Sequence, residues 1–316
     1  MRPVAILDCG TNSTRVLVAA ATGATLERRM TITRLGQGVD ATGRLAAEAI
    51  ERTVAALGEF RICMDRNGVP IDAAHVQVLA TSAARDAANR DELFDRIAAT
   101  VGVAPTLLDG HEEGRLSFEG ATAGIHPPHD GSPVLVVDIG GGSTELVAGV
   151  PGQAPLGTIS VDVGCVRLTE RFICQDPAEP EDLANAIGWV RDHLRDDVDR
   201  ELPDAHRATT CIGLAGTVST LAMLDLGTSE YDRNRVHGHV MSRAVIEDWF
   251  RHLAFLDRED RLGNPGMEEG RVDVIVGGLC ALVAVVRHYE LDAITVSESD
   301  ILDGGAARLL AALSPG

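Results

Sequence analysis

Short apolar runs alternate with stretches of helical spacing along the first half of the chain. The apolar runs predict strands near residues 3–9, 14–20, 24–34 and 75–80, with a shorter strand near 104–108. Apolar residues recur at helical spacing over about 44–66, as at Leu45, Ala49 and Val54, and further helices are predicted near 90–101 and 111–123. The first half therefore mixes strands with helices.

A segment rich in turn-forming residues separates the two halves, reading Pro127-Pro128-His129-Asp130-Gly131-Ser132-Pro133. After it, apolar runs predict strands near 134–138, 144–149, 155–162 and 293–297, and a strand–turn–helix over 209–221. Helices are predicted near 164–173, 179–201, 242–255, 270–289 and 303–313. Strand hairpins followed by alternating helices and strands are typical of α/β proteins with mixed sheets. We expect two related α/β lobes with a cleft between them.

The same short sequence occurs twice, at residues 3–18 and 133–148, with an offset of 130 and no gap. The matching pairs are Pro3/Pro133, Asp8/Asp138, Gly10/Gly140, Ser13/Ser143 and Thr14/Thr144. Each copy predicts a strand–turn–strand hairpin in which an aspartate ends the first strand. The copies differ mainly where Arg15 corresponds to Glu145.

The residue types in these hairpins suit a phosphate ligand and a metal ion. Glycine lets the backbone approach a ligand closely, successive N–H groups in such turns form an anion-binding nest, and aspartate holds hydrated Mg²⁺. Two such loops facing each other would clamp a phosphate chain. The alternative is that each aspartate only caps its turn, but two copies in register favour the ligand interpretation.

Composition limits the class of protein. With 316 residues and 45% hydrophobic content, the chain can bury a core and form about two domains. No apolar run is long enough for a membrane span, and no signal peptide is expected, because Met1-Arg2-Pro3 leads directly into the strand ending near Asp8. The six cysteines contain no CxxC pair and lie mostly in apolar runs, so Cys9 and the others are interpreted as buried, reduced residues of a cytoplasmic protein.

The chain contains no lysine, and all 28 basic residues are arginine. This excludes a GxxxxGK[ST] P-loop, a protein-kinase ATP lysine and a Schiff-base lysine. A net charge of −19 argues against nucleic-acid binding. A phosphate ligand would have to be bound by backbone N–H groups, a metal ion and a few arginines, because the field in a cleft depends on its own lining.

Five motifs carry a resemblance to a known family: Leu7–Ser13, Ala80–Arg85, His111–Leu116, Val137–Glu145 and Gly270–Ile275. Together with Gly213-Leu-Ala-Gly216-Thr217, they resemble the superfamily of actin, heat-shock chaperones and sugar kinases. Within it, the chain resembles the exopolyphosphatase/guanosine-pentaphosphate phosphohydrolase (Ppx/GppA) family in its short, two-domain form. The resemblance implies two actin-like (ribonuclease H-like) lobes, residues 1–128 and 129–302, with the first lobe completed by a C-terminal helix within 303–316.

The resemblance also implies roles for individual residues. Glu113 would be the catalytic base, Asp138 and Glu145 would coordinate Mg²⁺ (or Mn²⁺), and Asp8 would act through a metal-bound water. The phosphate-binding residues would be Gly10, Thr11, Asn12, Ser13, Arg85, Gly140, Gly141, Gly142, Ser143, Thr144 and Arg271. From the residues alone, Glu112 and Glu113 equally well complement a helix dipole. The alternative for Arg85 is a helix-start ion pair, and the alternative for Arg271 is an ion pair with Asp273 or a nearby acidic group.

The function implied is Mg²⁺-dependent release of orthophosphate from the end of inorganic polyphosphate. Guanosine pentaphosphate or a nucleoside tri- or diphosphate is the alternative substrate. A superfamily kinase and a non-enzymatic nucleotide-binding module are further alternatives. With few arginines in the cleft we expect a shallow salt dependence and a preference for short chains, unless a homodimer joins two arginine clusters into a longer track.

Two further patterns concern ligand binding. Residues 297–304 read Ser-Glu-Ser-Asp-Ile-Leu-Asp-Gly where longer family members carry Leu-Arg-Glu-Gly, so one arginine is missing. His237-Gly-His239 has zinc-like spacing, but without a third ligand pattern it is interpreted as two solvent-facing histidines of a strand.

Overall fold

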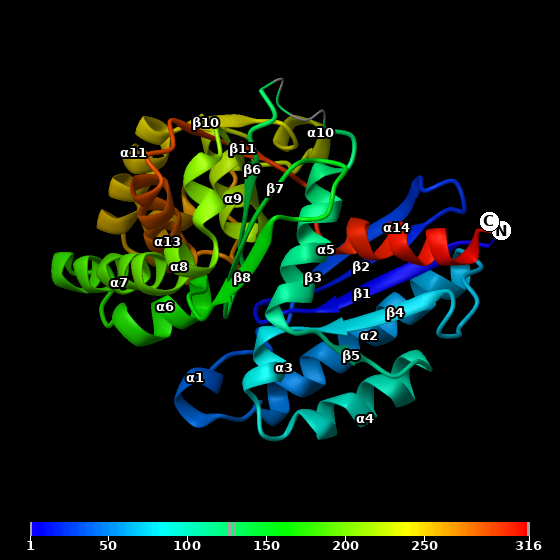
Figure 1. Cartoon of the computed structure of the whole chain (residues 1–316). Coiled ribbons are helices and arrows are strands. Elements are labelled where there is room, and N and C mark those ends of the chain that lie inside the picture. The colour runs from blue at the N-terminus through cyan, green and yellow to red at the C-terminus, as the bar shows by residue number, and fades with distance from the viewer. Residues whose placement is uncertain (1, 126–127, 129, 315–316) are drawn as a thin grey trace. The chain divides into compact units, whose positions relative to one another are not determined.

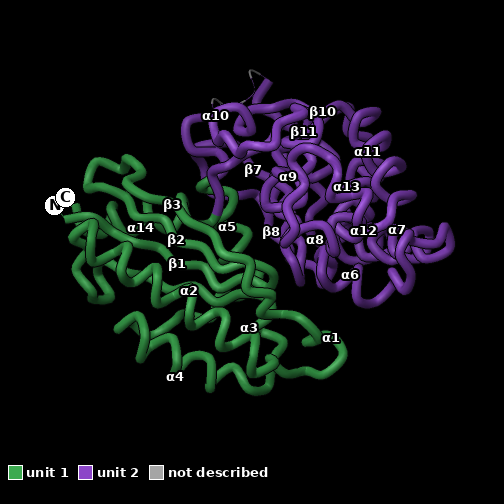
Figure 2. The backbone as a smooth tube through the Cα atoms, turned by 180° about the vertical axis from the view of Figure 1, so that it is seen from behind, with its two compact units in different colours: residues 1–120, 301–316 green, residues 121–300 purple. Residues whose placement is uncertain are grey.

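The computed structural model describes residues 2–125, 128 and 130–314 (Figure 1). Residues 127 and 129 of the predicted turn-rich segment lie outside this described part. The chain divides into two compact units, one formed by residues 1–120 with 301–316 and the other by residues 121–300 (Figure 2). The final helix therefore belongs to the same unit as the N-terminal strands.

Unit 1 is built on a five-stranded sheet. Its strands are β1 (Val4–Cys9), β2 (Ser13–Ala19), β3 (Thr25–Ile32), β4 (Val76–Ala80) and β5 (Thr106–Leu107), in the order β3-β2-β1-β4-β5. The first three strands are antiparallel, whereas β4 runs parallel to β1 and β5 parallel to β4. The helices are α1 (Val39–Thr42), α2 (Ala47–Arg66), α3 (Ser82–Asp86), α4 (Arg90–Val101), α5 (Gly110–Thr122) and α14 (Ile301–Leu313).

Alternating side chains of β1 supply both hydrophobic cores of unit 1. Successive residues of a strand point to opposite faces, so Ala5, Leu7 and Cys9 join the core formed with α2 and α4. Val4 and Ile6 join the core on the other face, formed with α5 and α14. Apart from Asp8 the strand is apolar, and it is fully buried because both of its faces are covered.

Unit 2 repeats this sheet and adds one strand. Its strands are β6 (Val134–Ile139), β7 (Thr144–Gly149), β8 (Gly157–Val161), β9 (Thr210–Leu214), β10 (Val240–Ser242) and β11 (Ala293–Val296), in the order β10-β11-β9-β6-β7-β8. The order β8-β7-β6-β9-β11 has the same strand directions as the unit 1 sheet. The helices include α6 (Cys165–Phe172), α7 (Pro180–His193), α9 (Ala215–Asp225), α10 (Arg233–Val236), α11 (Arg243–Phe255), α12 (Arg258–Leu262) and α13 (Ile275–His288).

The two hairpins of the sequence repeat have the same backbone hydrogen bond. The Gly10 N–H donates to the Ser13 carbonyl at 3.1 Å, and the Gly140 N–H donates to the Ser143 carbonyl at 3.0 Å. Together with the shared strand order, this confirms the prediction of two related α/β lobes.

Several elements differ from the prediction. The helix predicted over 179–201 is α7 followed by a π-helical turn (Leu194–Val198) and the short α8 (Asp199–Glu201). The helix predicted from 270 begins at Ile275. The histidine pair is not in a strand but precedes β10, where the His237 Nδ1 accepts a hydrogen bond from the Glu298 N–H. The short helices α1, α3, α10 and α12 were not predicted, because one turn of helix is too short to show a hydrophobic period.

The C-terminal helix α14 packs closely against α5. A Cβ added at Gly304 would lie 2.2 Å from the Leu116 carbonyl oxygen, so the two backbones nearly touch there. Leu302, in the segment that departs from the family pattern, is buried in the core on the same side.

Nothing in the described residues forms a helix with the length and hydropathy required to cross a bilayer.

The contact at Gly304 gives a stability prediction. We expect Gly304→Ala to lower the free energy of unfolding by about 1–3 kcal/mol, because the added methyl group must push two helices apart. Gly188→Ala in α7 is the matched control, since a Cβ there would meet no atom within 4 Å, and alanine favours a helix interior by up to about 1 kcal/mol. Urea unfolding of both variants tests this, and equal effects would contradict it.

Candidate active site

In unit 1, the turn between β1 and β2 directs its carbonyl groups toward residues 33–36. The Thr11 carbonyl accepts from the Gly36 N–H at 2.8 Å, and the Asn12 carbonyl accepts from the N–H groups of Thr33 and Arg34 at 3.1 and 2.9 Å. Within the described part of the chain, the Thr11 and Asn12 N–H groups have no protein acceptor, and neither has the buried side-chain amide of Asn12. Consecutive free N–H groups form an anion-binding nest.

In unit 2, the N-terminal turn of α6 binds the corresponding carbonyls. The Gly140 carbonyl accepts from the Cys165 N–H at 2.9 Å, and the Gly141 carbonyl accepts from the N–H groups of Val166 and Arg167 at 2.8 and 3.2 Å. The Arg167 Nε donates to the Gly142 carbonyl at 2.8 Å. Among described residues, no acceptor faces the Gly141 and Gly142 N–H groups. Both hairpin turns thus offer backbone donors to an anion, as the repeat predicts.

The position at which the two copies differ changes the charge of each hairpin. Asp8 lies opposite Arg15 in the strand register, and the guanidinium donates to the Asp8 Oδ2 from Nη2 at 2.6 Å and from Nε at 3.0 Å. In unit 2, Asp138 lies opposite Glu145, and both are buried. Like charges directly opposite one another are unfavourable, so the unit 2 hairpin favours a cation where the unit 1 hairpin already has Arg15.

The donor set at Asp138 and Glu145 fits a magnesium ion. Mg²⁺ prefers oxygen ligands, commonly one or two carboxylates. Glu145 is held by the hydroxyl groups of Ser143 and Ser160, which each donate to its Oε1 at 2.7 Å. Sequence analysis missed Ser160, although the predicted third strand of the hairpin places it beside Glu145. The structure brings Asp138 and Glu145 together as expected, and places Asp8 in the other unit.

Glu112 and Glu113, at the start of α5, have different partners. The Arg85 Nη1 donates to the Glu113 Oε2 at 2.5 Å and also to the Leu108 carbonyl at 3.1 Å. Glu112 instead accepts from Arg308 on α14. The ion pair considered for Arg85 is therefore present, and its partner is the glutamate predicted to be the catalytic base. Glu112 is part of the packing of α14 on α5.

Arg271 lies against the backbone at the start of α9. A Cβ added at Gly216 would be 2.2 Å from the Arg271 Cζ, so only glycine leaves room for this guanidinium. Burial raises the pKa of the Cys165 thiol, and the nearby positive charge of Arg271 opposes that shift. Arg271 is thus close to Cys165, whose N–H donates to the Gly140 carbonyl in the unit 2 turn. Asp273 accepts from the Arg258 Nε at 2.8 Å.

Cys9 follows the first aspartate directly but is buried. Burial and the charge of Asp8 raise the pKa of its thiol far above neutral pH. Because the thiolate is the nucleophile, this supports the interpretation of Cys9 as a packing residue.

The contact between α6 and the unit 2 turn gives a binding prediction. A Cβ at Gly164 would lie 2.3 Å from the Gly141 carbonyl oxygen, so Gly164→Ala must displace the turn. We expect affinity for inorganic pyrophosphate, measured by calorimetry, to fall about tenfold or more, as when one charge-assisted hydrogen bond is lost. Gly188→Ala is the control, and equal affinity in the two variants would show that this turn does not bind the anion.

Comparison with known proteins identifies the family. Residues 16–309 match the model of the Ppx/GppA phosphatase family. Exopolyphosphatase 2 of Mycobacterium tuberculosis is 40% identical over 97% of this chain and 98% of its own length. A crystal structure of an exopolyphosphatase-like protein superimposes with a TM-score of 0.90 at 36% identity, covering 99% of this chain and all of that one. The Aquifex aeolicus family member superimposes with a TM-score of 0.79 at 29% identity, covering 99% of both chains. The family predicted from the sequence motifs is confirmed: the chain belongs to the Ppx/GppA phosphatase family.

Proposed function

We propose that this protein is an exopolyphosphatase that hydrolyses the terminal phosphoanhydride of inorganic polyphosphate and releases orthophosphate. The observation that carries the proposal is the pair of hairpin turns whose N–H groups at residues 11–12 and 141–142 face no protein acceptor in the described structure. The similarity to exopolyphosphatase 2 over nearly the whole of both chains supports polyphosphate as the substrate.

Phosphoryl transfer requires mainly positioning and neutralisation of charge. In the proposed mechanism, the turn N–H groups bind phosphate oxygens, and the Asn12 amide adds a donor. Glu113, oriented by Arg85, takes the proton of the attacking water at a carboxylate oxygen. Asp138 and Glu145 would hold Mg²⁺, with Mn²⁺ as the alternative, and the ion would neutralise the charge that develops on the phosphate oxygens. Arg271 and Arg85 are proposed as phosphate contacts, and Asp8 as a metal partner through water.

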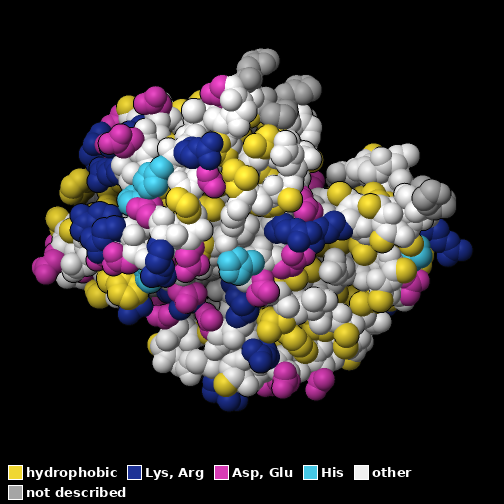
Figure 3. All heavy atoms as spheres, viewed as in Figure 1, with side chains coloured by type: hydrophobic (Ala, Val, Ile, Leu, Met, Phe, Trp, Pro, Cys, Tyr) yellow, Lys and Arg dark blue, Asp and Glu magenta, His cyan; other side chains and the backbone are white. Residues whose placement is uncertain are grey.

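The charge distribution favours short substrates. On the face drawn in Figure 3, arginine side chains are interspersed with aspartate and glutamate side chains. Arg15 already pairs with Asp8, and Arg115 pairs with Glu119 at 3.3 Å, so part of the arginine charge is neutralised within the protein. In a chain of net charge −19, phosphates far from the turns would be repelled.

A substrate panel tests the proposed activity. We expect Mg²⁺-dependent phosphate release from tripolyphosphate and short polyphosphate, measured with malachite green, and kcat/KM that stays flat or falls as the chain lengthens. ATP and guanosine pentaphosphate are expected to be poorer substrates. Faster release from guanosine pentaphosphate would favour the nucleotide alternative, and processive digestion of long chains with a steep salt dependence would contradict the short-substrate preference.

A glutamine substitution tests the role of Glu113. We expect Glu113→Gln to lower kcat on tripolyphosphate by about 10²–10⁴-fold, because glutamine cannot accept the proton of water, with substrate binding largely retained. The adjacent Glu112→Gln is the matched control, because Glu112 contacts Arg308 and not Arg85. Normal turnover in the Glu113 variant would remove this residue from the mechanism.

Two other classes of function are separated by the same assays. Transfer of phosphate to a sugar or to acetate instead of water would indicate a superfamily kinase. A single slow turnover coupled to partner binding would indicate a nucleotide-binding module.

We also propose a cytoplasmic location, because the cysteines are free and five of the six are buried. Homodimer formation stays a prediction.

A further inference from the structure

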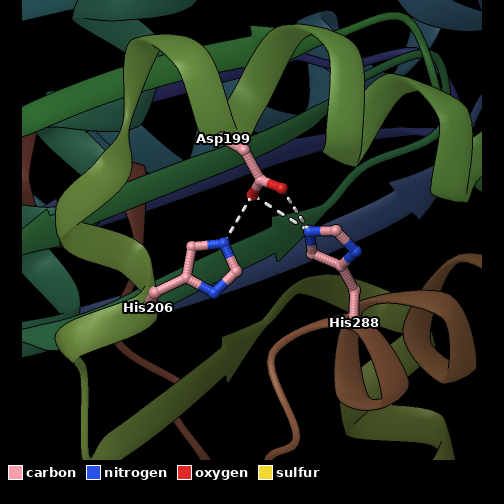
Figure 4. Close-up of side chains that lie close together, drawn as sticks. All are labelled: Asp199, His206 and His288. Atoms are coloured by element: carbon pink, nitrogen blue, oxygen red, sulfur yellow. Dashed lines mark hydrogen bonds and ion pairs between the residues drawn. The ribbon is translucent and has the colours of Figure 1, made fainter.

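Two histidines and an aspartate meet in unit 2 outside the hairpin turns (Figure 4). Asp199 lies in α8, His206 in the 3-10 helix Pro203–Arg207, and His288 at the end of α13. The His206 Nε2 lies 2.8 Å from the Asp199 Oδ1, and the His288 Nε2 lies 2.9 Å from both carboxylate oxygens. His288 and Asp199 are 89 residues apart in the sequence, so their meeting is a product of the fold.

The three side chains form a donor set for a transition metal. One ligand atom from each lies within 4.8 Å of the others, and among the described residues no other three of His, Cys, Asp and Glu meet this condition. In a tetrahedral zinc site with bonds of about 2.0–2.1 Å, neighbouring ligand atoms are about 3.3 Å apart. The two His–Asp separations are a few tenths of an ångström shorter, so small outward movements would admit an ion.

The surroundings of the cluster allow those movements and leave a coordination position for water. The side chain of His206 is 48% exposed and that of Asp199 26%, whereas His288 is 14% exposed and more firmly placed. A zinc ion with three protein ligands keeps an open fourth position for water. Two nitrogen donors and one carboxylate favour Zn²⁺ or a neighbouring late first-row ion over Mg²⁺, which prefers oxygen.

Tyr289 packs against the same cluster. Its ring packs against His206 and His288, with ring centroids 4.9 and 4.8 Å apart. The residue is 9% exposed, and its hydroxyl interacts with the Asp199 carboxylate without reaching full hydrogen-bond geometry. A metal-bound water would give this hydroxyl an acceptor at full hydrogen-bond geometry.

We propose that Asp199, His206 and His288 form a binding site for Zn²⁺ or a similar late first-row divalent cation. The ion would fasten the segment from Asp199 to His206 to the last turn of α13. Metal bonds from three separate elements would restrain this segment more strongly than the two His–Asp hydrogen bonds alone.

The proposed site is separate from the turn at residues 140–142 of the same unit. Near the start of α13, a Cβ at Gly277 would lie 2.7 Å from the Cys165 carbonyl, beside the turn. His288 is 11 residues further along the helix, about 16 Å at 1.5 Å per residue. Leu202, between two of the ligands, contacts Gly157, which pairs with Ala148 at the far end of the β7–β8 hairpin. The proposed site therefore lies away from the turn at residues 140–142 and does not depend on the proposed enzymatic function.

The pair His237 and His239, which has zinc-like spacing in the sequence, does not contribute to this site. His239 pairs with Asp225 through Nε2 at 2.7 Å, and the His237 Nδ1 accepts from a backbone N–H.

Metal binding to the purified full chain tests the proposal directly. The Cys174→Ser background removes the one exposed cysteine, and millimolar Mg²⁺ is added to compete with Zn²⁺ for the carboxylates of Asp138 and Glu145. After chelation and equilibrium dialysis against Zn²⁺, we expect one bound Zn²⁺ per chain by elemental analysis, and a higher Tm with Zn²⁺ than without. No stoichiometric Zn²⁺ in this protein would overturn the proposal.

Three variants locate the ion. His206→Gln and Asp199→Asn are expected to weaken Zn²⁺ binding at least about tenfold, the loss that even an outer-shell partner can cause. His193→Gln is the matched control, because His193 pairs with Asp197 at 2.9 Å without a third ligand in the described structure. Equal binding in His206→Gln and His193→Gln would refute the assignment.

A readout on the unsubstituted protein covers the case in which a variant fails to fold. Co²⁺ is expected to give the visible absorption of a four- or five-coordinate site, displaced by Zn²⁺, with perturbed histidine side-chain NMR signals. Phosphate release from tripolyphosphate is expected to be unchanged in His206→Gln, which separates this test from that of the proposed function. A hydrogen-bonded His–Asp–His cluster without metal affinity would give neither signal.

Discussion

The structure depends most on the hydrogen bonds that orient the peptide groups of two hairpin turns. In unit 1 the turn carbonyls accept from residues 33–36, and in unit 2 they accept from the first turn of α6. A peptide group with its carbonyl bound on one side presents its N–H on the other, so each turn becomes a fixed set of donors. Donors positioned before a ligand arrives need no reorganisation when they bind a phosphate.

A single cross-strand position gives the two turns different charge. Arg15 neutralises Asp8 in unit 1, whereas Glu145 adds a second carboxylate beside Asp138 in unit 2. The two turns therefore have the same backbone hydrogen bond but carry different side-chain charge. The hydroxyls of Ser143 and Ser160 hold Glu145 in place, which prepares the carboxylate pair for a cation. On the unit 1 side, Arg85 holds Glu113 in the same way.

Helix α13 connects the two candidate sites of unit 2. Glycines at its start let α6 and α9 approach closely, because a Cβ at Gly277 or Gly278 would collide with Thr169 or Thr217. Its last residue contributes His288 to the His–Asp–His cluster. The helix is almost entirely buried, so its ends are held firmly relative to each other. A metal ion at one end would fasten the last turn of this helix, away from the turn at residues 140–142 near its start.

The sequence by itself determined the features that depend on near neighbours. Hydrophobic periodicity located the long helices and strands, and the repeat predicted both hairpins and the pairing of Asp138 with Glu145, because two strands joined by a short turn fix their own register. Only the tertiary structure decided contacts between distant segments. These include Arg85 with Glu113, Arg271 against Gly216, α6 against the turn at 140–142, and the meeting of Asp199 with His288. No local pattern encodes such contacts, because each is set by the path of the chain between its two ends.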